Sequence, residues 1–356
     1  MWSYHYTQYG CNPKYITEYI LKNYNSIYDI YWIMNKKSDK SLIPENVHII
    51  RSHSFLHFYY INTAEFVITN CRSRVFFWKK RKGQKYIMTW HGGICLKKIE
   101  KDAANELPEH YIKMSIYDGK ICDLIPACSK FQEELIKKSY YYSGEILCKG
   151  APRNDVFFDS KCISEIKQKI KKRYSISDSD KIVLYAPTFR SDLSISLFKL
   201  DWSSLVPNLS KMLGGDIQVL LRLHPNMLDA GYNSNEIFDS LVIDVTDYPD
   251  MQELLCITDL LITDYSSTMF DVCMLQKPCI LYAPDHLTYD RGFYFPLKSL
   301  PFPLAEDQKA LTHIISEFKE NEYFNKVKSF INNNICIYDE GYASKEIVNW
   351  MIEHHL

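Results

Sequence analysis

The segment DLLITDYSSTMFD (residues 259–271) decides the fold. Its apolar run LLIT has the composition of a short buried strand, a polar turn follows, and the remaining residues have helical spacing. A strand that leads directly into a helix is typical of a parallel sheet, because parallel neighbours must be joined by a crossover connection. The segment therefore predicts an α/β fold.

Strand-like and helix-like stretches alternate along the rest of the chain in the same way. The predicted strands are 28–34, 65–70, 85–90, 122–129 and 144–150 in the first half, and 181–187, 217–225, 240–245, 259–264 and 278–284 in the second. The predicted helices are 12–24, 129–140, 163–174, 248–258 and 267–276, with N-caps at Asn12 and Ser129 for the first two. The segment GAPRNDVFF (150–158) separates the two series. We therefore predict two Rossmann-like parallel-sheet domains, residues 1–155 and 156–340, that face each other across a cleft at the C-terminal ends of both sheets.

The composition is that of a globular protein and disfavours several other classes. The chain has 356 residues, enough for two domains, and its net charge of -1 gives no overall field for nucleic acid. The eleven cysteines form no CxxC pair and no zinc-like cluster, so we expect reduced thiols, a cytoplasmic location and no metal. The sequence shows neither a signal peptide nor an apolar run of transmembrane length.

Polar side chains follow four of the predicted strands at the point where each strand ends. They are His91 in the first half and, in the second half, Thr188 with Arg190, His224 with Asn226, and Asp264 with Ser266 and Ser267. Because open parallel sheets bind ligands at the C-terminal ends of their strands, we expect these groups to line a site.

The turn at residues 264–267 predicts an anion site. Ser266 or Ser267 can cap the helix that follows, where free backbone N–H groups and the helix dipole favour negative charge. The alternative is a serine cap that binds nothing. Arg190 and His224 at neighbouring strand ends favour the first interpretation, since guanidinium groups suit phosphate oxygens. The sequence thus predicts a diphosphate site without a metal, and it contains no P-loop or GxGxxG motif.

His91 stands in TWHGG (89–93), where the strand 85–90 ends. An imidazole titrates near neutral pH and can act as a general base. Gly92 and Gly93 would let a substrate approach the backbone closely, or would allow a tight turn. The alternative is a core histidine that is hydrogen-bonded to a nearby carbonyl. The strand-end position favours the functional role.

The strongest basic run is WKKRKGQK (78–85), with Arg72 and Arg74 upstream and Lys98 downstream. Its candidate contact residues are Lys79, Lys80, Arg81 and Lys82, joined by Lys97. One interpretation is a solvated loop. The other is a contact for an anionic acceptor or a membrane surface, because the run leads directly into the strand before His91.

Five motifs resemble, in this order, those of the CDP-glycerol glycerophosphotransferases, the teichoic-acid and capsule-type polyol-phosphate transferases of bacteria. They are TWHGG, GAPRND, LYAPTFR, LRLHPN and LITDYSSTMFDVCMLQKPCILYAPD, and the resemblance extends over about residues 8–300. It implies a GT-B architecture with an acceptor-side N-terminal domain, a donor-nucleotide site in the C-terminal domain and no metal requirement. It also implies that a helix within 341–356 packs back on the first domain.

The resemblance assigns roles at the matched positions. His91 is similar to the family's catalytic base, Arg190 and His224 to residues that hold the donor phosphates, and Ser266 and Ser267 to the phosphate-binding helix start, with Asp264 and Asp271 as supports. The chain departs from the family pattern after His91, where it reads HGGICLK (91–97) and the family usually continues His-Gly-Thr-Pro-Leu-Lys.

The expected function is transfer of glycerol phosphate, or another polyol phosphate such as ribitol phosphate, from a CDP-activated donor. The acceptor would be a hydroxyl of a cell-surface polymer or its lipid-linked primer, CMP would leave, and the enzyme would work in the cytoplasm with a contact at the inner face of the membrane. Two alternatives stay open: a GT-B glycosyltransferase that uses a nucleotide sugar in capsule or lipopolysaccharide synthesis, and a catalytically silent subunit of a polymer-synthesis complex.

Overall fold

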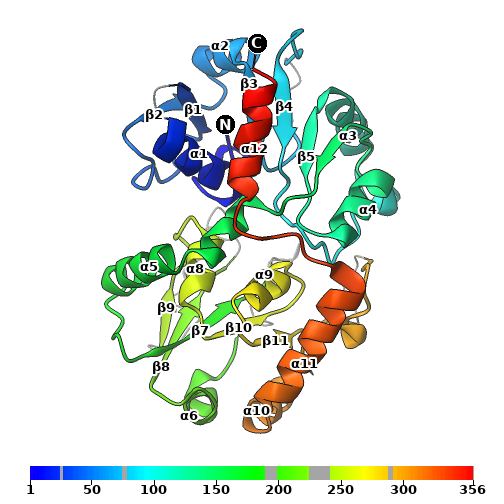
Figure 1. The fold of residues 1–356 in the computed structure, drawn as a ribbon. Helices are drawn as coiled ribbons and strands as arrows, with labels where there is room; N and C mark the ends of the chain where they lie inside the picture. Colours follow the sequence, from blue (N-terminus) through cyan, green and yellow to red (C-terminus); the bar gives the residue numbers. More distant parts are fainter. Residues whose placement is uncertain (25–26, 74–77, 189–198, 224–240, 288–291, 356) are drawn as a thin grey trace. The chain divides into compact units, whose positions relative to one another are not determined.

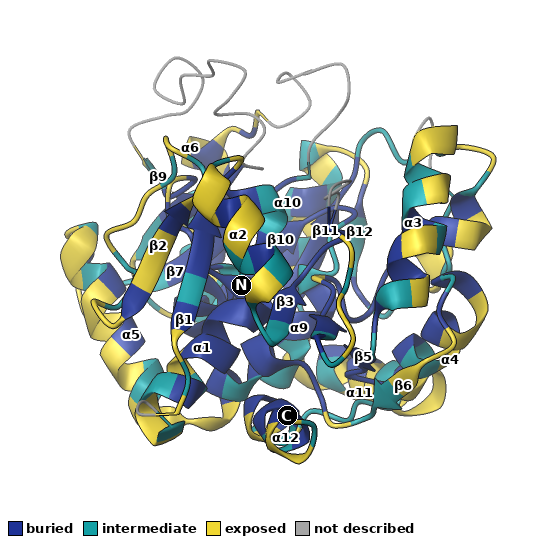
Figure 2. Ribbon diagram, turned by 90° about the horizontal axis from the view of Figure 1, so that it is seen from above, coloured by how far each residue is buried: buried dark blue, intermediate teal, exposed yellow. Residues whose placement is uncertain are grey.

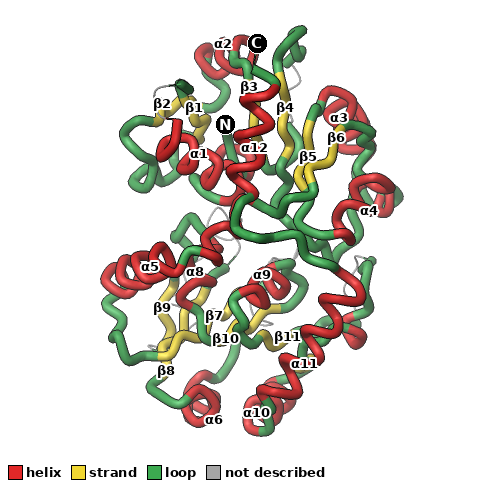
Figure 3. Tube along the Cα trace, viewed as in Figure 1, coloured by secondary structure: helices red, strands yellow, loops and turns green. Residues whose placement is uncertain are grey.

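The computed structural model describes residues 1–24, 27–73, 78–188, 199–223, 241–287 and 292–355. The chain divides into two units, which we call unit 1 (Met1–Asp159 with Ile335–Leu356) and unit 2 (Ser160–Asn334). Strands and helices alternate in each unit (Figure 3), and every strand pairing is parallel. The predicted α/β class with two parallel-sheet units is confirmed.

Unit 2 contains a six-stranded sheet in the order β12-β11-β10-β7-β8-β9. The strands are β7 (Lys181–Ala186), β8 (Ile217–Leu221), β9 (Val242–Asp244), β10 (Leu260–Thr263), β11 (Cys279–Tyr282) and β12 (Leu304–Ala305). The helices are α5 (Ser160–Arg173), α6 (Trp202–Leu213), α8 (Met251–Ile257), α9 (Thr268–Met274), α10 (Gln308–Ser316) and α11 (Glu320–Phe330). Read from β9, the strands follow the order of a doubly wound dinucleotide-type sheet, in which the first and fourth strands are neighbours. These two strands are β7 and β10, so the topological switch point lies between them.

The core of unit 2 explains why its strands are nearly continuous apolar runs. All four residues of β10 are buried, and α8 packs on β7 while α9 packs on β10 and β11. Helices α6 and α10 contact each other and, respectively, β8 and β12. A strand covered on both faces needs apolar side chains on both, which is the pattern of LLIT.

Unit 1 contains two parallel sheets, β1-β2 and β3-β4-β5-β6 (Figure 1). The strands are β1 (Ile30–Met34), β2 (Val47–Arg51), β3 (Phe66–Thr69), β4 (Lys85–Met88), β5 (Leu124–Pro126) and β6 (Glu145–Leu147). The helices are α1 (Cys11–Tyr24), α2 (Phe55–Thr63), α3 (Glu109–Ile121), α4 (Lys130–Ser139) and α12 (Ala343–Glu353), with 3-10 turns η1 (Tyr4–Tyr6), η2 (Glu100–Ala103) and η3 (Pro152–Phe158).

The first two residues lie between the two sheets of unit 1. The Met1 carbonyl accepts from Ile33 N at 2.9 Å, and the Met1 amino group donates to the Tyr31 carbonyl at 2.6 Å, both on β1. On the other side, Trp2 N donates to the Ile68 carbonyl of β3 at 3.2 Å. This segment therefore links β1 to β3 where no regular strand is present.

Helix α12 belongs to unit 1 and packs on α1. The Asp155 carboxylate accepts from the N–H groups of Ala343 (2.9 Å) and Ser344 (2.8 Å), which begin this helix. Its Trp350 donates to Glu145 Oε2 at 2.9 Å. Residues 335–340, which we predicted in the second domain, also lie in unit 1, because Asp339 accepts from Ala151 N at 2.8 Å.

The predicted elements agree with the observed ones, which are mostly shorter. The Ser129 cap is confirmed, since its hydroxyl accepts from Gln132 N at 3.1 Å. The predicted Asn12 cap is wrong: Asn12 lies inside α1, and its buried amide bonds to other parts of unit 1. The elements that the sequence did not predict are β2, β12, α2, α3, α6, α10 and α11.

Candidate active site

His91 follows β4 and is held by a neighbouring strand end. Its Nδ1 lies 2.9 Å from the carbonyl oxygen of Asn70, the residue after β3. A carbonyl can only accept, so Nδ1 carries the proton in this contact. In the neutral ring the other nitrogen, Nε2, then has the free lone pair, which is the form that a general base requires. The predicted alternative, a carbonyl-bonded histidine, and the functional role are therefore compatible.

The backbone that carries His91 is held at three successive carbonyl groups. The Asn12 amide donates to the carbonyls of Thr89 (3.2 Å) and Trp90 (2.9 Å). The guanidinium of Arg153, on η3, donates to the next carbonyl, that of His91 itself. Asn12 Oδ1 also accepts from Arg153 N at 2.9 Å, which joins the two supporting residues. A rigid backbone results at the place where a base has to be positioned.

Aromatic rings enclose the imidazole on two sides. Trp90 stacks on it with a centroid separation of 5.2 Å and an interplanar angle of 25°, and Tyr4 approaches edge-on at 5.6 Å. Trp90 has a φ of 55°, in the left-handed region that residues other than glycine rarely adopt. Backbone strain of this kind persists only where the surroundings enforce it, and it is common at functional sites.

The pKa of His91 lies below its ordinary value. The residue is solvent-exposed, yet protein atoms crowd the rest of the ring, and this desolvation disfavours the charged imidazolium. The Asn70 carbonyl acts in the opposite direction, and the Arg153 guanidinium adds to the lowering by repulsion. His91 is thus kept neutral near pH 7, which suits a base.

Arg72 is buried, so the prediction that it reinforces a basic surface is wrong. Its guanidinium pairs with Glu100 at 2.9 Å and Asp118 at 3.4 Å, and it donates to the Tyr140 carbonyl at 2.5 Å. It also lies over the Trp90 ring at 5.9 Å. Such a pair is satisfied internally, so it supports the loop after β3 and is not available to a ligand on the surface.

Gly93 lies against the loop that follows β5. A Cβ at this position would lie 2.3 Å from Cys128 Sγ, so the glycine is required by packing. Its φ is outside the left-handed region. Gly92 is buried and its carbonyl accepts from the Cys95 thiol. Both residues therefore support the site through the protein's own packing.

The basic run lies at the other edge of the sheet from His91. It precedes β4 and His91 follows it, so the length of the strand, roughly 13 Å, separates them. Lys80 pairs with Asp123, just before β5, at 2.6 Å, and Arg81 donates to the carbonyl of Thr63, just before β3, at 2.7 Å. The prediction that the basic run lies beside His91 is therefore wrong.

The candidate contact residues differ in exposure. Lys79, Arg81 and Lys82 are exposed, and Lys80 is half-buried. Lys97, which follows His91, is also half-buried.

In unit 2 the switch point holds a carboxylate. The buried Asp264, which follows β10, accepts from the N–H of Thr188, which follows β7, at 2.9 Å and 3.1 Å. It also accepts from its neighbour Tyr265 N at 2.6 Å. Asp264 thus fixes the two strand ends between which doubly wound sheets bind ligands.

The two serines after Asp264 differ in their contacts. Ser266 Oγ accepts from the Thr268 hydroxyl at 2.9 Å and from Thr268 N at 3.4 Å. Ser267 is the residue before α9 and makes no side-chain cap. Both are half-buried. Asp271 is buried on α9 and accepts from Gln252 Nε2 of α8 at 3.0 Å, so it supports the helix from within.

The structure brings three of the six predicted donor-phosphate residues together with the predicted support Asp264, and it does not describe the other three. Thr188, Asp264, Ser266 and Ser267 gather after β7 and β10. Arg190, His224 and Asn226 lie outside the described residues, as does Arg74. The sequence did not predict that Asn12 and Arg153 support the backbone at His91. The motif GAPRND, which contains Arg153, could have indicated the role of Arg153.

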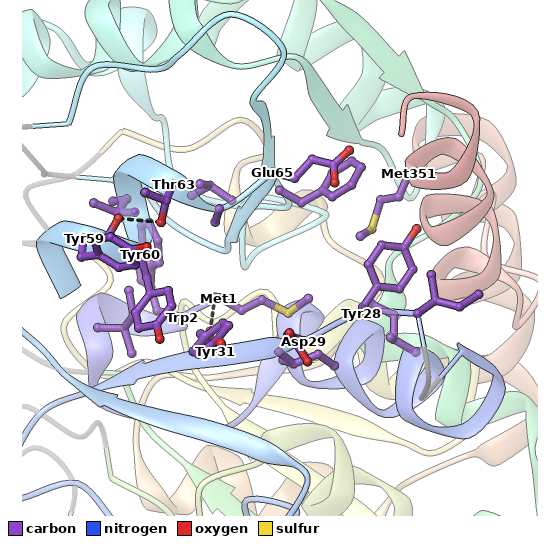
Figure 4. A pocket seen from close by; sticks show the side chains of 18 of the residues that line it. Met1, Trp2, Tyr28, Asp29, Tyr31, Tyr59, Tyr60, Thr63, Glu65 and Met351 are labelled. Atoms are coloured by element: carbon purple, nitrogen blue, oxygen red, sulfur yellow. Dashed lines mark hydrogen bonds between the residues drawn. The ribbon is translucent and has the colours of Figure 1, made fainter. Parts of the chain in front are cut away.

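A pocket of about 340 Å³ in unit 1 contains none of the predicted site residues (Figure 4). It is lined by Tyr28 and Tyr31 of the β1 region, Tyr60 of α2, Glu65 before β3, and Met351 of α12. These groups surround the N-terminal ends of β1 and β3, so the pocket lies at the sheet edge away from His91.

The described residues contain neither a metal-binding cluster nor a membrane-spanning helix. No three His, Cys, Asp or Glu side chains are grouped there so as to hold a metal ion. Among the helices described, none has the length and hydropathy needed to cross a bilayer.

Two α/β units with parallel sheets, one of them in the doubly wound order, agree with the predicted GT-B fold class. The sequence profile of the family described as CDP-glycerol:poly(glycerophosphate) glycerophosphotransferase matches residues 1–353, and the chain belongs to this family. It is therefore an enzyme of the transferase type.

Named relatives agree with this membership. The teichoic acid poly(glycerol phosphate) polymerase of Bacillus spizizenii is 30% identical over 98% of this chain and 90% of its own length. The teichoic acid glycerol-phosphate transferase of Staphylococcus aureus is 30% identical over 97% and 90%. The polymerase of Bacillus subtilis is also 30% identical, but the chain spans only 47% of that protein's length.

Solved structures show the same fold. The wall teichoic acid polymerase TagF superposes with a TM-score of 0.84 at 30% identity, over 99% of this chain and 88% of that one. A further TagF structure, soaked with CDPG, also has a TM-score of 0.84 at 28% identity, over 99% and 87%. A Staphylococcus aureus MnaA–UDP structure gives 0.56 at 14% identity over 99% and 95%, which shows the fold alone.

Proposed function

We propose that this enzyme transfers glycerol phosphate from CDP-glycerol to a hydroxyl of a teichoic-acid-type polymer or its lipid-linked primer, with release of CMP. Family membership and the polymerase relatives support the donor and acceptor classes. The observation that carries the proposal is the contact of His91 Nδ1 with the Asn70 carbonyl, because it leaves Nε2 as a base. Another CDP-polyol, such as CDP-ribitol, would fit the same chemistry.

The reaction is a displacement at phosphorus. His91 Nε2 takes the proton of the acceptor hydroxyl while that oxygen attacks the phosphorus that bears the glycerol. The bond from this phosphorus to the bridging oxygen breaks, and CMP leaves with the bond electrons. Such a transition state needs positioning and charge stabilisation around the phosphoryl oxygens.

The donor phosphates would be held in unit 2. The N–H groups and hydroxyls of Ser266 and Ser267 would contact phosphate oxygens, Thr188 lies beside them, and Arg190, His224 and Asn226 complete the set by sequence position. Asp264 would maintain the separation of the two strand ends. We propose that no metal takes part, because the protein supplies the cationic and N–H groups itself.

Calorimetry without added metal tests the donor class. CDP-glycerol, CDP-ribitol, UDP-glucose and UDP-N-acetylglucosamine are titrated into the protein, with and without EDTA. Binding of a CDP-polyol alone, weakened at least tenfold by the double variant Ser266→Ala/Ser267→Ala, is the expected result. Binding of a UDP-sugar alone would make the enzyme a glycosyltransferase and contradict the proposal.

A transfer assay tests the role of His91. His91→Ala is expected to lose CMP release while its affinity for CDP-glycerol stays within about threefold of the parent. Loss of donor binding in this variant would contradict the assignment of His91 as the acceptor base. CMP release by the parent protein would also exclude a catalytically silent subunit.

We also propose that unit 1 contacts an anionic membrane surface through α2 and the basic run. Helix α2 exposes Phe55 (78%), Leu56 (50%) and Phe58 (47%), and its outer face is yellow in Figure 2. The Arg81–Thr63 bond joins the basic run to the end of this helix. Aromatic side chains beside cations are typical of a surface that enters the headgroup region of an anionic bilayer.

Vesicle flotation tests this contact. The protein is expected to float with phosphatidylcholine vesicles that contain a third phosphatidylglycerol, and to float less in high salt. Phe55→Ser/Phe58→Ser and Lys79→Gln/Lys82→Gln should each reduce the bound fraction severalfold. Leu287→Ser, which changes an exposed apolar residue of unit 2 (85% exposed), is the matched control. Equal binding by all variants would contradict the proposal.

A further inference from the structure

Arg153 is the buried cation next to the candidate base. It is only 4% exposed, and it lies on η3, far along the chain from β4. Its N–H is fixed by Asn12, and its guanidinium donates to the backbone carbonyl of His91. Transfer of a guanidinium from water into the protein costs free energy, which its contacts there must offset.

We propose that Arg153 is a positioning residue that holds the His91 backbone and keeps the imidazole in its neutral, proton-accepting form. The inference rests on the proposed function of His91 as base. An amide or hydroxyl donor could hold the carbonyl as well, but only a cation also opposes protonation of the neighbouring ring. The two functions of Arg153, hydrogen-bond donor and positive charge, can therefore be separated by substitution.

Two other described contacts of the ring are uncharged. Asn70 contributes a neutral carbonyl, and Tyr4 of η1 presents the edge of a phenol ring. Arg72 lies behind Trp90, but its charge is balanced by Glu100 and Asp118. Burial is the main cause of the lowered His91 pKa, the Arg153 guanidinium adds to the lowering, and the Asn70 carbonyl acts against it.

The proposal makes a specific statement about pH. A cation beside His91 shifts the protonation of the imidazole to lower pH, so the base form persists under mildly acidic conditions. Removal of the charge should raise the His91 pKa, so that at pH 6 more of the enzyme is protonated and inactive. At pH 8 the ring is neutral with or without Arg153, and activity should depend on positioning alone.

Two substitutions separate charge from hydrogen bonding. Arg153→Gln keeps a donor without charge, and Arg153→Lys keeps the charge with a different donor. Histidine signals of the ¹³C,¹⁵N-histidine-labelled full chain are titrated by NMR, and His91 is assigned from its absence in His91→Asn. We expect the His91 pKa to rise in Arg153→Gln and to remain lowered in Arg153→Lys.

The kinetic readout should follow the titration. In Arg153→Gln the acid limb of the kcat/KM profile is expected to move to higher pH by the same amount, whereas a purely structural role would lower the rate equally at all pH values. An unchanged His91 pKa in Arg153→Gln would overturn the proposal. If that variant does not fold, a His91 pKa that rises to its ordinary value in Arg153→Lys would overturn it instead.

The NMR titration does not depend on turnover. If no CDP-polyol is transferred, the proposed function fails, and the effect of Arg153 on His91 is still measured. If transfer occurs and the pKa does not respond to Arg153, the proposed function stands and the inference fails.

Discussion

The thiol of Cys128 occupies the space into which a side chain at position 93 would project. A Cβ on Gly93 would lie 2.3 Å from Cys128 Sγ and 3.5 Å from Cys128 Cβ. The loop that carries His91 is thereby packed on the loop after β5. This chain has Gly93 where the family usually has threonine, and Cys128, after β5, fills the space that a side chain at position 93 would occupy.

This contact predicts a rescue. Gly93→Ala should lower the free energy of unfolding by about 1–3 kcal/mol, because the new methyl group overlaps the thiol. In Gly93→Ala/Cys128→Ala the sulfur is gone and the remaining contact is of ordinary van der Waals length, so most of the loss should be recovered. Urea unfolding of the two variants and of Cys128→Ala measures the coupling. Additive effects would show that the two residues are not in contact.

Asn12 should matter far more than another asparagine of the same helix. Asn12→Ala removes the donor to the Thr89 carbonyl, at a cost of about 1–3 kcal/mol for this unsatisfied group, and leaves the Trp90 carbonyl with only the longer bond from the Thr89 hydroxyl. Asn23→Ala is the control, since Asn23 also donates to a carbonyl, that of Tyr19, but is exposed. Thermal unfolding and CMP release should both be impaired by the first change only.

Because Arg72 pairs with Glu100 and Asp118 in the interior, its substitution should cause a large loss of stability that does not depend on salt. Arg72→Met leaves Glu100 and Asp118 buried without their cation, and should lower the free energy of unfolding by about 3–5 kcal/mol. Lys137→Met, which breaks the exposed pair with Glu133 on α4, should cost little, because solvent and salt screen an exposed pair. Chemical denaturation at low and high salt distinguishes them. Similar losses in both variants would contradict this account.

Stability should fall below neutral pH, in part through His57. Burial on α2 lowers the pKa of this imidazole from 6.5 to about 4. Between these two pH values the unfolded chain therefore binds the proton more readily than the folded one, so the free energy of unfolding decreases as pH falls from 6.5 toward 4. His57→Gln should flatten this decrease, with a part remaining because of His91. His110→Gln, which changes an exposed histidine of α3, is the control variant.

Most strands of both units could be predicted, β2 and β12 being the described exceptions, because covered parallel strands are nearly continuous apolar runs. Such strands are apolar on both faces, as in KIVLYA (181–186) and LLIT, so a run of apolar letters identifies them without periodicity. Helix α2 could not be found in this way. Its sequence FLHFYYINT is apolar on nearly all sides, although Phe55 and Phe58 are exposed, so no amphipathic pattern is present.

At the site, the sequence predicted correctly which residues follow a strand. It did not predict which residues that are distant in sequence are in contact. His91 and Asp264 follow their strands as expected. The burial of Arg72 could not be read from the sequence, because its partner Glu100 is 28 residues away. The basic run was placed near His91 since the two are close in sequence, but a strand moves the chain from one edge of its sheet to the other.

The return of α12 to unit 1 has a consequence for the order in which this protein can fold. Unit 2 is one uninterrupted segment, whereas unit 1 is assembled from both sides of it. On the ribosome, the sheet of unit 2 can be complete while the nascent chain still lacks Ile347 and Val348, which join the same apolar cluster as Ile16 and Ile20 of α1. Unit 1 therefore finishes folding only after unit 2 has been translated, and the apolar surface of α1 stays uncovered until α12 emerges.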